Sequence, residues 1–440
     1  MPANTATSNK LSNPGSHANY MHAAAAANLS HRLPQLGRQS TKWQPLVFSS
    51  CLEGMPQHWA PCIVGKAANP TLAVGEELLY PAFSIPEPGF IKEEDATWWR
   101  TMASDFAPDR YHLRAGRAIF ADQHGQNLLL KNVRFRNAPV SDVWADNACM
   151  SSLVSHRALQ PLPAGELPSW GRVVLVNSPD SWSFQHFTDR AVNVLLQSEG
   201  WQQAGTHLVG GRAPTSSQVL GLWHILAEAG GRQEVHFGVS DFTAEELVFS
   251  CRAPLTHPYM AARLAELVQL PAAPPLEQRK VVLYFSRNTD ALGNRGVRKV
   301  LNEDAVLEAI REVLAKRNRG EELVVFDAKK FPNLTDVTAL MTNVMAIVGP
   351  HGGALHNAWW AAPETLLLEL YPTSYKGTVF WECGSIRGLI YWLLRSQSDA
   401  NQNITPDPAL VARILREQLG KRREAEEPRL HSEWAMSELL

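Results

Sequence analysis

The second half of the chain alternates regularly between short apolar runs and amphipathic segments. Apolar runs at 280–287, 322–328, 345–349 and 365–372 predict buried strands, and the segment 302–317 has apolar residues at helical spacing. Strands that alternate with helices are typical of βαβ units and a parallel sheet. We therefore expect an α/β domain here, closed by a helix over about 408–423.

A similar alternation begins at Trp170. Apolar runs at 172–177 and 206–211 predict strands, and segments at 186–200 and 216–230 predict helices. Two further strand-like runs follow, at 234–239 and 246–251. The pattern predicts a second α/β unit that precedes the first one along the chain.

The remaining segments set the expected domain limits. No apolar period occurs over residues 1–45, which we expect to be a disordered arm. From Trp43 to about Pro88, prolines and short apolar clusters predict irregular structure, and a helix is expected from Glu93. A proline-rich break at 270–278 predicts a linker. The expected division is an arm, an N-terminal domain, a C-terminal domain and a polar tail (1–45, 46–272, 273–425 and 426–440).

Composition excludes some classes of protein. Hydrophobic residues make up 45% of the 440 residues, which excludes a wholly disordered chain. The net charge of −2 does not favour a nucleic-acid partner. Five cysteines form no CxxC pair, so a zinc site is not expected from them. Neither a transmembrane helix nor an N-terminal signal peptide is expected.

Two loops of the second half contain residues suited to anion binding. Arg287, Arg295 and Arg298 lie within twelve positions after a predicted strand, and guanidinium groups suit phosphate oxygens; a solvated basic loop is the alternative. In GPHGGAL (349–355), Gly352 would let a ligand approach backbone N–H groups. A tight turn with a structural histidine is the alternative there. No GxGxxG occurs, so a dinucleotide fingerprint is absent.

Three acidic or basic positions are candidates for proton transfer or ligand contact. His186 and Asp189 follow the first regular strand, and either could act as a general base; the alternative is that the segment caps a helix and packs. Glu369 lies in an apolar run, so it is either a buried paired carboxylate or a ligand contact at a strand end. A ribose or an arginine of the same domain would be suitable partners.

The ordered set of motifs resembles a known family. SR (286–287), RKVLNE (298–303), GPHGGAL with Asn357, and LLLELYP (366–372) follow SWSFQHFTD (181–189) and ELVFSCRAPLTHPYM (246–260). The series is similar to glycosyltransferase family 61, which includes protein O-linked N-acetylglucosaminyltransferases and plant xylan xylosyl- and arabinosyltransferases. The resemblance covers about residues 173–372.

The resemblance implies a GT-B fold, in which two Rossmann-like domains face each other across a cleft. It implies a UDP-linked nucleotide-sugar donor, bound by the C-terminal domain, and inversion at the anomeric carbon. The acceptor would be a hydroxyl of a glycan or glycoprotein on the N-terminal side. The positions that match the family's donor-binding motifs are Ser286, Arg287, Arg298, His351, Gly352, Gly353, Ala354, Leu355, Asn357 and Glu369.

The resemblance also implies that the catalytic base comes from the first domain, hence His186 or Asp189. Many members have a histidine at the position of Gln185, and many read HGAGL, with Gly353 and Ala354 exchanged. A catalytically inactive nucleotide-sugar-binding protein is therefore an alternative. Another α/β sugar-nucleotide enzyme is a second one, although no P-loop or dinucleotide fingerprint supports it.

No DxD occurs, so we expect a metal-independent transferase without a cofactor, in which positive side chains and backbone N–H groups stabilise the leaving diphosphate. Xylose, arabinose or N-acetylglucosamine is the sugar that the family suggests. The family also suggests a place in the secretory pathway, in the Golgi or the endoplasmic reticulum.

Overall fold

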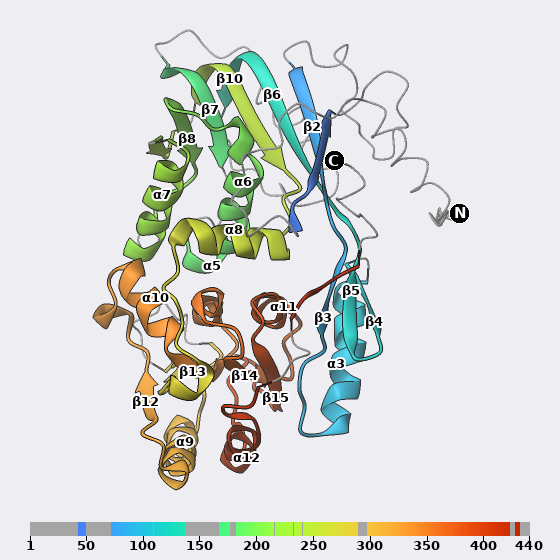
Figure 1. Ribbon diagram of the computed structural model, residues 1–440, viewed down its shortest axis with the longest axis vertical. Helices are drawn as coiled ribbons and strands as arrows, with labels where there is room; N and C mark the ends of the chain where they lie inside the picture. The colour runs from blue at the N-terminus through green and yellow to red at the C-terminus, as the bar shows by residue number, and fades with distance from the viewer. Residues whose placement is uncertain are drawn as a thin grey trace, which may run out of the picture.

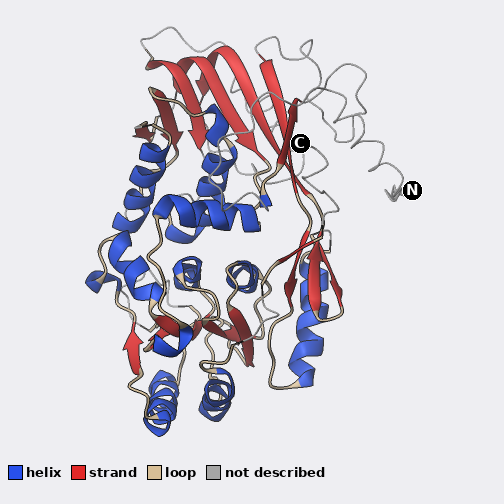
Figure 2. Cartoon of the chain, in the orientation of Figure 1, coloured by secondary structure: helices blue, strands red, loops and turns tan. Residues whose placement is uncertain are grey.

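The computed structural model of the protein describes most of the chain after residue 42. The described residues are 43–49, 72–108, 110–136, 167–176, 182–214, 216–231, 233–239, 241–288, 297–422 and 427–431. They form three β-sheets with helices between and beside them (Figure 2). Most of the predicted arm lies outside this part of the chain. None of the described helices combines the length and the apolar character needed to cross a membrane.

The largest sheet has seven strands, in the order β1-β2-β6-β10-β7-β8-β9. Strands β10, β7, β8 and β9 are parallel, whereas β1, β2 and β6 run antiparallel to their neighbours. The bounds in this order are Leu46–Ser49, Leu72–Tyr80, Gln123–Arg136, Asp241–Cys251, Ser169–Val176, Thr206–Gly210 and Glu234–Phe237. The expectation of irregular structure before residue 88 was wrong, because two of these strands lie there and pair with β6 or with each other.

Helices cover one face of this sheet. Val174 and Leu208, from strands β7 and β8, belong to the same buried apolar cluster as Leu195, Leu222 and Leu264. These three leucines come from α6, α7 and α8, whose bounds are Val192–Gln197, Ser217–Ala229 and Pro258–Val268. The alternating side-chain directions of the strands explain the arrangement, because neighbours such as Val173 and Val209 point to the opposite face.

The second sheet has five parallel strands, in the order β12-β11-β13-β14-β15. Their bounds in this order are Glu322–Val325, Val281–Tyr284, Val344–Pro350, Leu366–Pro372 and Ile390–Ser396. The prediction of a parallel sheet is confirmed here. β13 and β14 are buried along their whole length, as strands covered on both faces are.

Helices lie on both sides of the second sheet. On one side, Ile310 of α9 (Glu303–Arg317) and Leu415 of α12 (Pro408–Gln418) belong to the same buried apolar cluster as Leu368. On the other side lie α10, the 3-10 helix η7 and α11, with bounds Leu334–Thr342, Gly353–Trp360 and Val379–Ile386. This second group faces the helices of the first sheet (Figure 1). One apolar cluster contains residues of both groups, so the two helical layers share a core.

A small antiparallel sheet of four strands connects the two halves, in the order β16-β3-β5-β4 (Arg429–Leu430, Phe83–Pro86, Arg117–Phe120 and Tyr111–Arg114). Gly89, after β3, forms a bridge with Trp392 of β15. The next helix, α3 (Glu93–Phe106), packs on the second half through Trp99, whose ring centroid lies 4.8 Å from that of Trp381. The chain therefore contacts the second sheet long before the linker at 270–278.

The α/β class is confirmed, and the GT-B arrangement and the domain limits stay predictions. One predicted helix differs in kind from the expectation. The segment 186–200 is split into a short α-helix α5 (Phe184–His186), a π-helix η2 (Phe187–Ala191), α6 and a 3-10 turn. The segment after GPHGG is a 3-10 helix.

Candidate active site

The centre of the site is a buried hydrogen-bonded group on three adjacent strands of the second sheet. His351 directly follows β13, Glu369 lies in β14 and Tyr391 in β15. One carboxylate oxygen of Glu369 contacts His351 Nδ1, and the other accepts the hydroxyl of Tyr391. The side chains of His351 and Glu369 are 3% and 2% exposed. Among the described residues no arginine pairs with Glu369, whose partners within the chain are His351 and Tyr391, and the contact with a ribose stays a prediction.

The contact with Glu369 determines what the His351 ring can do. Burial lowers the pKa of His351, an effect that Glu369 opposes and that Arg298 and Arg287 reinforce. A neutral ring whose Nδ1–H donates to a carboxylate keeps a lone pair on Nε2. Neutral His351 is therefore an acceptor at Nε2, suited to a sugar hydroxyl, and it donates there only when it is protonated.

Arg287 lies against the glycine turn that follows His351. A Cβ added to Gly352 would lie 2.2 Å from Nη1 of Arg287, so only glycine allows this approach. Arg287 Nε donates to the carbonyl of Val297 at 3.3 Å. Burial, together with the nearby charge of Arg298, lowers the pKa of Arg287 to about 10, which leaves it charged at neutral pH.

Arg298 is held in place by its backbone. Its φ of 60° is in the left-handed region, and its N–H donates to the carbonyl of Asn401 at 3.0 Å. The guanidinium carbon lies 5.7 Å from the centroid of the Tyr375 ring, and that ring lies 3.8 Å from the ring of His351. Within the described residues Arg298 has no ion pair, and its buried Nε has no hydrogen-bond acceptor. A partly buried cation in this condition is suited to an anion from outside the chain.

Ser286 has a structural contact. Its hydroxyl donates to the carboxylate of Glu303 at 2.9 Å and accepts the N–H of Asn288 at 3.1 Å. The Asn288 side chain in turn bonds both the N–H and the carbonyl of Val300. These contacts fix the two ends of the loop that contains the arginines. Arg295 lies outside the described residues.

The other residues of the glycine turn form hydrogen bonds mainly through their backbone groups. Leu355 is fully buried in the shared core, and its N–H donates to the carbonyl of Gly352 at 2.9 Å. Asn357 donates to the carbonyl of Ala354 at 2.9 Å, while its buried Oδ1 has no partner in the described part of the chain. A polar atom left in this state is suited to a donor from a ligand or water.

Opposite the turn lies the segment 184–189 of the first half. A Cβ on Gly353 would lie 3.2 Å from Oε1 of Gln185, so this glutamine sits against the turn. His186 Nδ1 and Asp189 Oδ1 are 3.8 Å apart, too far for a hydrogen bond. The His186 side chain is 33% exposed and that of Asp189 is 9% exposed. Arg190 Nε lies 3.7 Å from the same carboxylate oxygen.

The π-helix η2 fixes the position of Asp189. The Thr188 hydroxyl donates to the carbonyls of Phe184 and Gln185, and Asn193 Nδ2 donates to the carbonyl of Asp189 at 2.9 Å. Single π-turns within helices are frequent at functional sites. The side-chain bonds replace part of the regular helical pattern here.

His356 was missed by the sequence analysis. It is fully buried in η7, and its Nε2 accepts the indole N–H of Trp359 at 2.6 Å. Burial lowers the pKa of His356 to about 4. Asp189 raises this pKa and His186 lowers it, so both side chains lie near His356. The only sequence signal was its place within the same turn as His351, where a spacing of five does not predict a shared helix face.

The upstream motif PLTHPYM has structural contacts. Thr256 and Arg110 both donate to Glu382 of α11, a fully buried carboxylate. His257 caps α8 by accepting the N–H of Tyr259 and contacts the carbonyl of Pro81. These bonds connect the two halves beside the site.

Two comparisons with known proteins gave matches. Residues 184–368 match the family model described as Glycosyltransferase 61, a range that runs from the segment with His186 to β14. A search of curated proteins gave no match. Among solved structures, one that is similar is a mutant of a flavo di-iron protein from Thermotoga maritima, at 10% identity and a TM-score of 0.21. That match covers 45% of this chain and 47% of the other.

Proposed function

We propose that the protein transfers a sugar from a nucleotide-sugar donor to a hydroxyl of a glycan or glycoprotein, because residues 184–368 match the model of glycosyltransferase family 61. The donor is UDP-linked, and the sugar is xylose, arabinose or N-acetylglucosamine. The second sheet binds the donor, and the first half presents the acceptor in a GT-B arrangement. The proposal includes a place in the secretory pathway.

The observation that carries the proposal is the state of Arg298. Its guanidinium has no anionic partner among the described residues, and it lies beside the Tyr375 and His351 rings. A donor diphosphate would supply the missing anion. Charge-assisted hydrogen bonds of this kind are about twice as strong as neutral ones.

The departing diphosphate is stabilised by this chain's own positive groups, without a metal. Arg287 and Arg298 are near enough for each to affect the titration of His351, so their two charges act on one region. Fixed positive groups in a site of low polarity stabilise developing negative charge without reorganisation. His351 Nε2 accepts a hydroxyl of the sugar or the ribose, and Glu369 keeps the ring in that state.

Inversion requires a base on the face of the sugar opposite the diphosphate. We assign that role to His186 and the orientation of its ring to Asp189. The exposure of His186 leaves it accessible to an acceptor, whereas Asp189 is buried beside it. Their 3.8 Å separation is longer than a hydrogen bond, as is common in enzymes without substrate.

The test is a panel of UDP-, GDP- and CMP-sugars, with both melting temperature and hydrolysis or transfer measured on the full chain with and without EDTA. A bound donor raises the melting temperature of the native state. We expect one UDP-sugar to do so and to be turned over in EDTA. Binding without turnover would instead support an inactive sugar-nucleotide-binding protein. Binding of no nucleotide sugar would contradict the proposal.

A further inference from the structure

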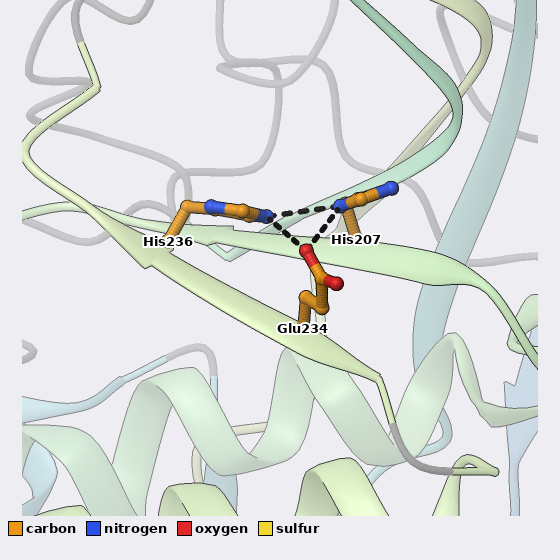
Figure 3. A group of neighbouring side chains, drawn as sticks. All are labelled: His207, Glu234 and His236. Atoms are coloured by element: carbon orange, nitrogen blue, oxygen red, sulfur yellow. Dashed lines mark hydrogen bonds and ion pairs between the residues drawn. The ribbon is translucent and has the colours of Figure 1, made fainter.

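Three side chains with metal-ligating atoms converge at the edge of the seven-stranded sheet, away from the glycine turn. His207 comes from β8, and Glu234 and His236 come from β9 (Figure 3). His207 Nδ1 and His236 Nε2 are 2.9 Å apart. The Glu234 carboxylate lies 3.6 Å from the first nitrogen and 3.7 Å from the second.

The sheet register brings these side chains together. β8 and β9 are parallel, and His207 pairs with Glu234. His236 is two residues farther along β9, so it lies on the same face as Glu234. The signal in the sequence is the Glu-x-His spacing at 234–236, which places two ligands on one side of a strand, but the third ligand depends on the pairing of the strands.

Trp170 restricts both imidazole rings. Its ring stacks on His207 with a centroid distance of 5.2 Å and on His236 with 4.6 Å, at interplanar angles of 24° and 28°. The two histidine side chains are 20% and 25% exposed. A stack of this kind orients the ring nitrogens before any ligand arrives, which reduces the entropy lost on binding.

We propose that His207, Glu234 and His236 bind one divalent transition-metal ion of the zinc type, with water in the remaining position. Two imidazoles and one carboxylate form a donor set that zinc accepts in proteins. With metal–ligand bonds of about 2.0–2.1 Å, neighbouring ligands of a tetrahedral ion are roughly 3.3 Å apart. The three observed separations, 2.9, 3.6 and 3.7 Å, are each within a few tenths of an ångström of this distance.

The position of the site points to a structural role. β9 is the edge strand of the sheet and pairs only with β8 among the described strands. A metal ion would cross-link this edge strand to its neighbour. His207 and Glu234 lie at the amino ends of β8 and β9, and His236 is two residues farther along β9, whereas the segment 184–189 follows the carboxyl end of β7. The site therefore does not depend on the proposed sugar transfer.

The experiment uses the full chain without a histidine tag, stripped with EDTA and then titrated with Zn²⁺ or Mg²⁺ in a calorimeter. We expect one Zn²⁺ per chain, a higher melting temperature with Zn²⁺, and neither effect with Mg²⁺, which prefers oxygen ligands. Glu234→Gln changes a side chain that is 73% exposed, so the fold should be retained. It should weaken Zn²⁺ binding by at least about 10-fold.

His236→Asn should lower the affinity further, and two exposed residues of α7 provide controls. His224→Gln and Glu228→Gln should bind Zn²⁺ like the unchanged chain. Absence of stoichiometric Zn²⁺ binding by the unchanged chain would overturn the proposal. Equal affinity in Glu234→Gln and the unchanged chain would also overturn it, since the ion would then be bound elsewhere.

Discussion

The guanidinium of Arg287 occupies the space beside Gly352 that any side chain would need. An added Cβ would lie 2.2 Å from Nη1 and 3.1 Å from the guanidinium carbon. The conformation of the glycine itself is extended, with φ 170°, so the backbone could accept another residue. The glycine is therefore required by the position of the arginine and not by the shape of the turn.

Gly352→Ala should weaken donor binding while the fold is retained. The arginine end is flexible and can move away, but it then leaves the position it has beside the turn. Loss of a hydrogen bond to a charged group costs about 1.5–3 kcal/mol, which is roughly 10- to 150-fold in affinity for UDP. Calorimetry would measure this. Gly171→Ala is the control, because no atom lies within 4 Å of its added Cβ. Equal affinities in the two variants would contradict the prediction.

The role of the Arg298 guanidinium in donor binding can be tested separately from the strain of its backbone. Arg298→Gly removes the guanidinium and suits the positive φ, so UDP affinity should fall by about 1.5–3 kcal/mol with little change in stability. Arg298→Ala keeps the positive-φ strain that Arg298 already has, so it should lose the same UDP affinity and be about 1 kcal/mol less stable than Arg298→Gly. Arg311→Ala, at an exposed position of α9, is the control. Unchanged UDP affinity in both Arg298 variants would remove this residue from the donor site.

The two base candidates predict different outcomes in turnover. If His186 is the base, His186→Ala should lower turnover by about 10²–10⁴-fold and leave donor affinity nearly unchanged. Asp189→Asn should then lower turnover less than His186→Ala does, since Asp189 only orients the His186 ring. A nearly silent His186→Ala together with an inactive Asp189→Asn would make the carboxylate the base. Activity in both variants would show that the base lies outside this segment.

Stability should decrease in acid because of two fully buried imidazoles. Burial lowers the pKa of His257 and of His356 to about 4, whereas an unfolded histidine titrates near 6.5. Between these values the unfolded chain binds more protons than the folded one, so the free energy of unfolding falls as pH falls. At pH 5 the loss relative to pH 7.5 is about 2 kcal/mol per imidazole.

Urea unfolding at the two pH values would measure this loss. His257→Gln should reduce the difference between pH 7.5 and pH 5 by about 2 kcal/mol, and His112→Gln, at an exposed position, should not reduce it. A difference that is the same in all three proteins would show that other groups determine the acid sensitivity.

The sequence predicted four of the five strands of the second sheet because local patterns determine them, whereas β15 was not predicted. Each strand there is an apolar run between polar turns, and motifs at strand ends, such as Arg287 and His351, lie near one edge of a parallel sheet. The hydrogen-bond partners of the site residues could not be predicted from local sequence patterns. Glu369 contacts Tyr391 through strand pairing, and Ser286 contacts Glu303 across a loop.

Contacts between the two halves of the chain could not be predicted from local sequence patterns. Gln185 meets Gly353 only because two helical layers pack together, and the π-helix depends on side-chain bonds from Thr188 and Asn193. The strands before residue 88 have mixed composition, and their pairing with β6 determines them. In these places tertiary structure overrides propensity.

The early contact of the chain with the second sheet affects how the protein folds as it is synthesised. The carbonyl of Pro86 accepts the indole N–H of Trp381, a residue 295 positions later, and Trp99 packs on that same indole. In a nascent chain, Trp99 and the carbonyl of Pro86 therefore lack these contacts until Trp381 has been synthesised. Because neither half completes its core alone, the protein should lose structure in one cooperative transition although it is built on two large sheets.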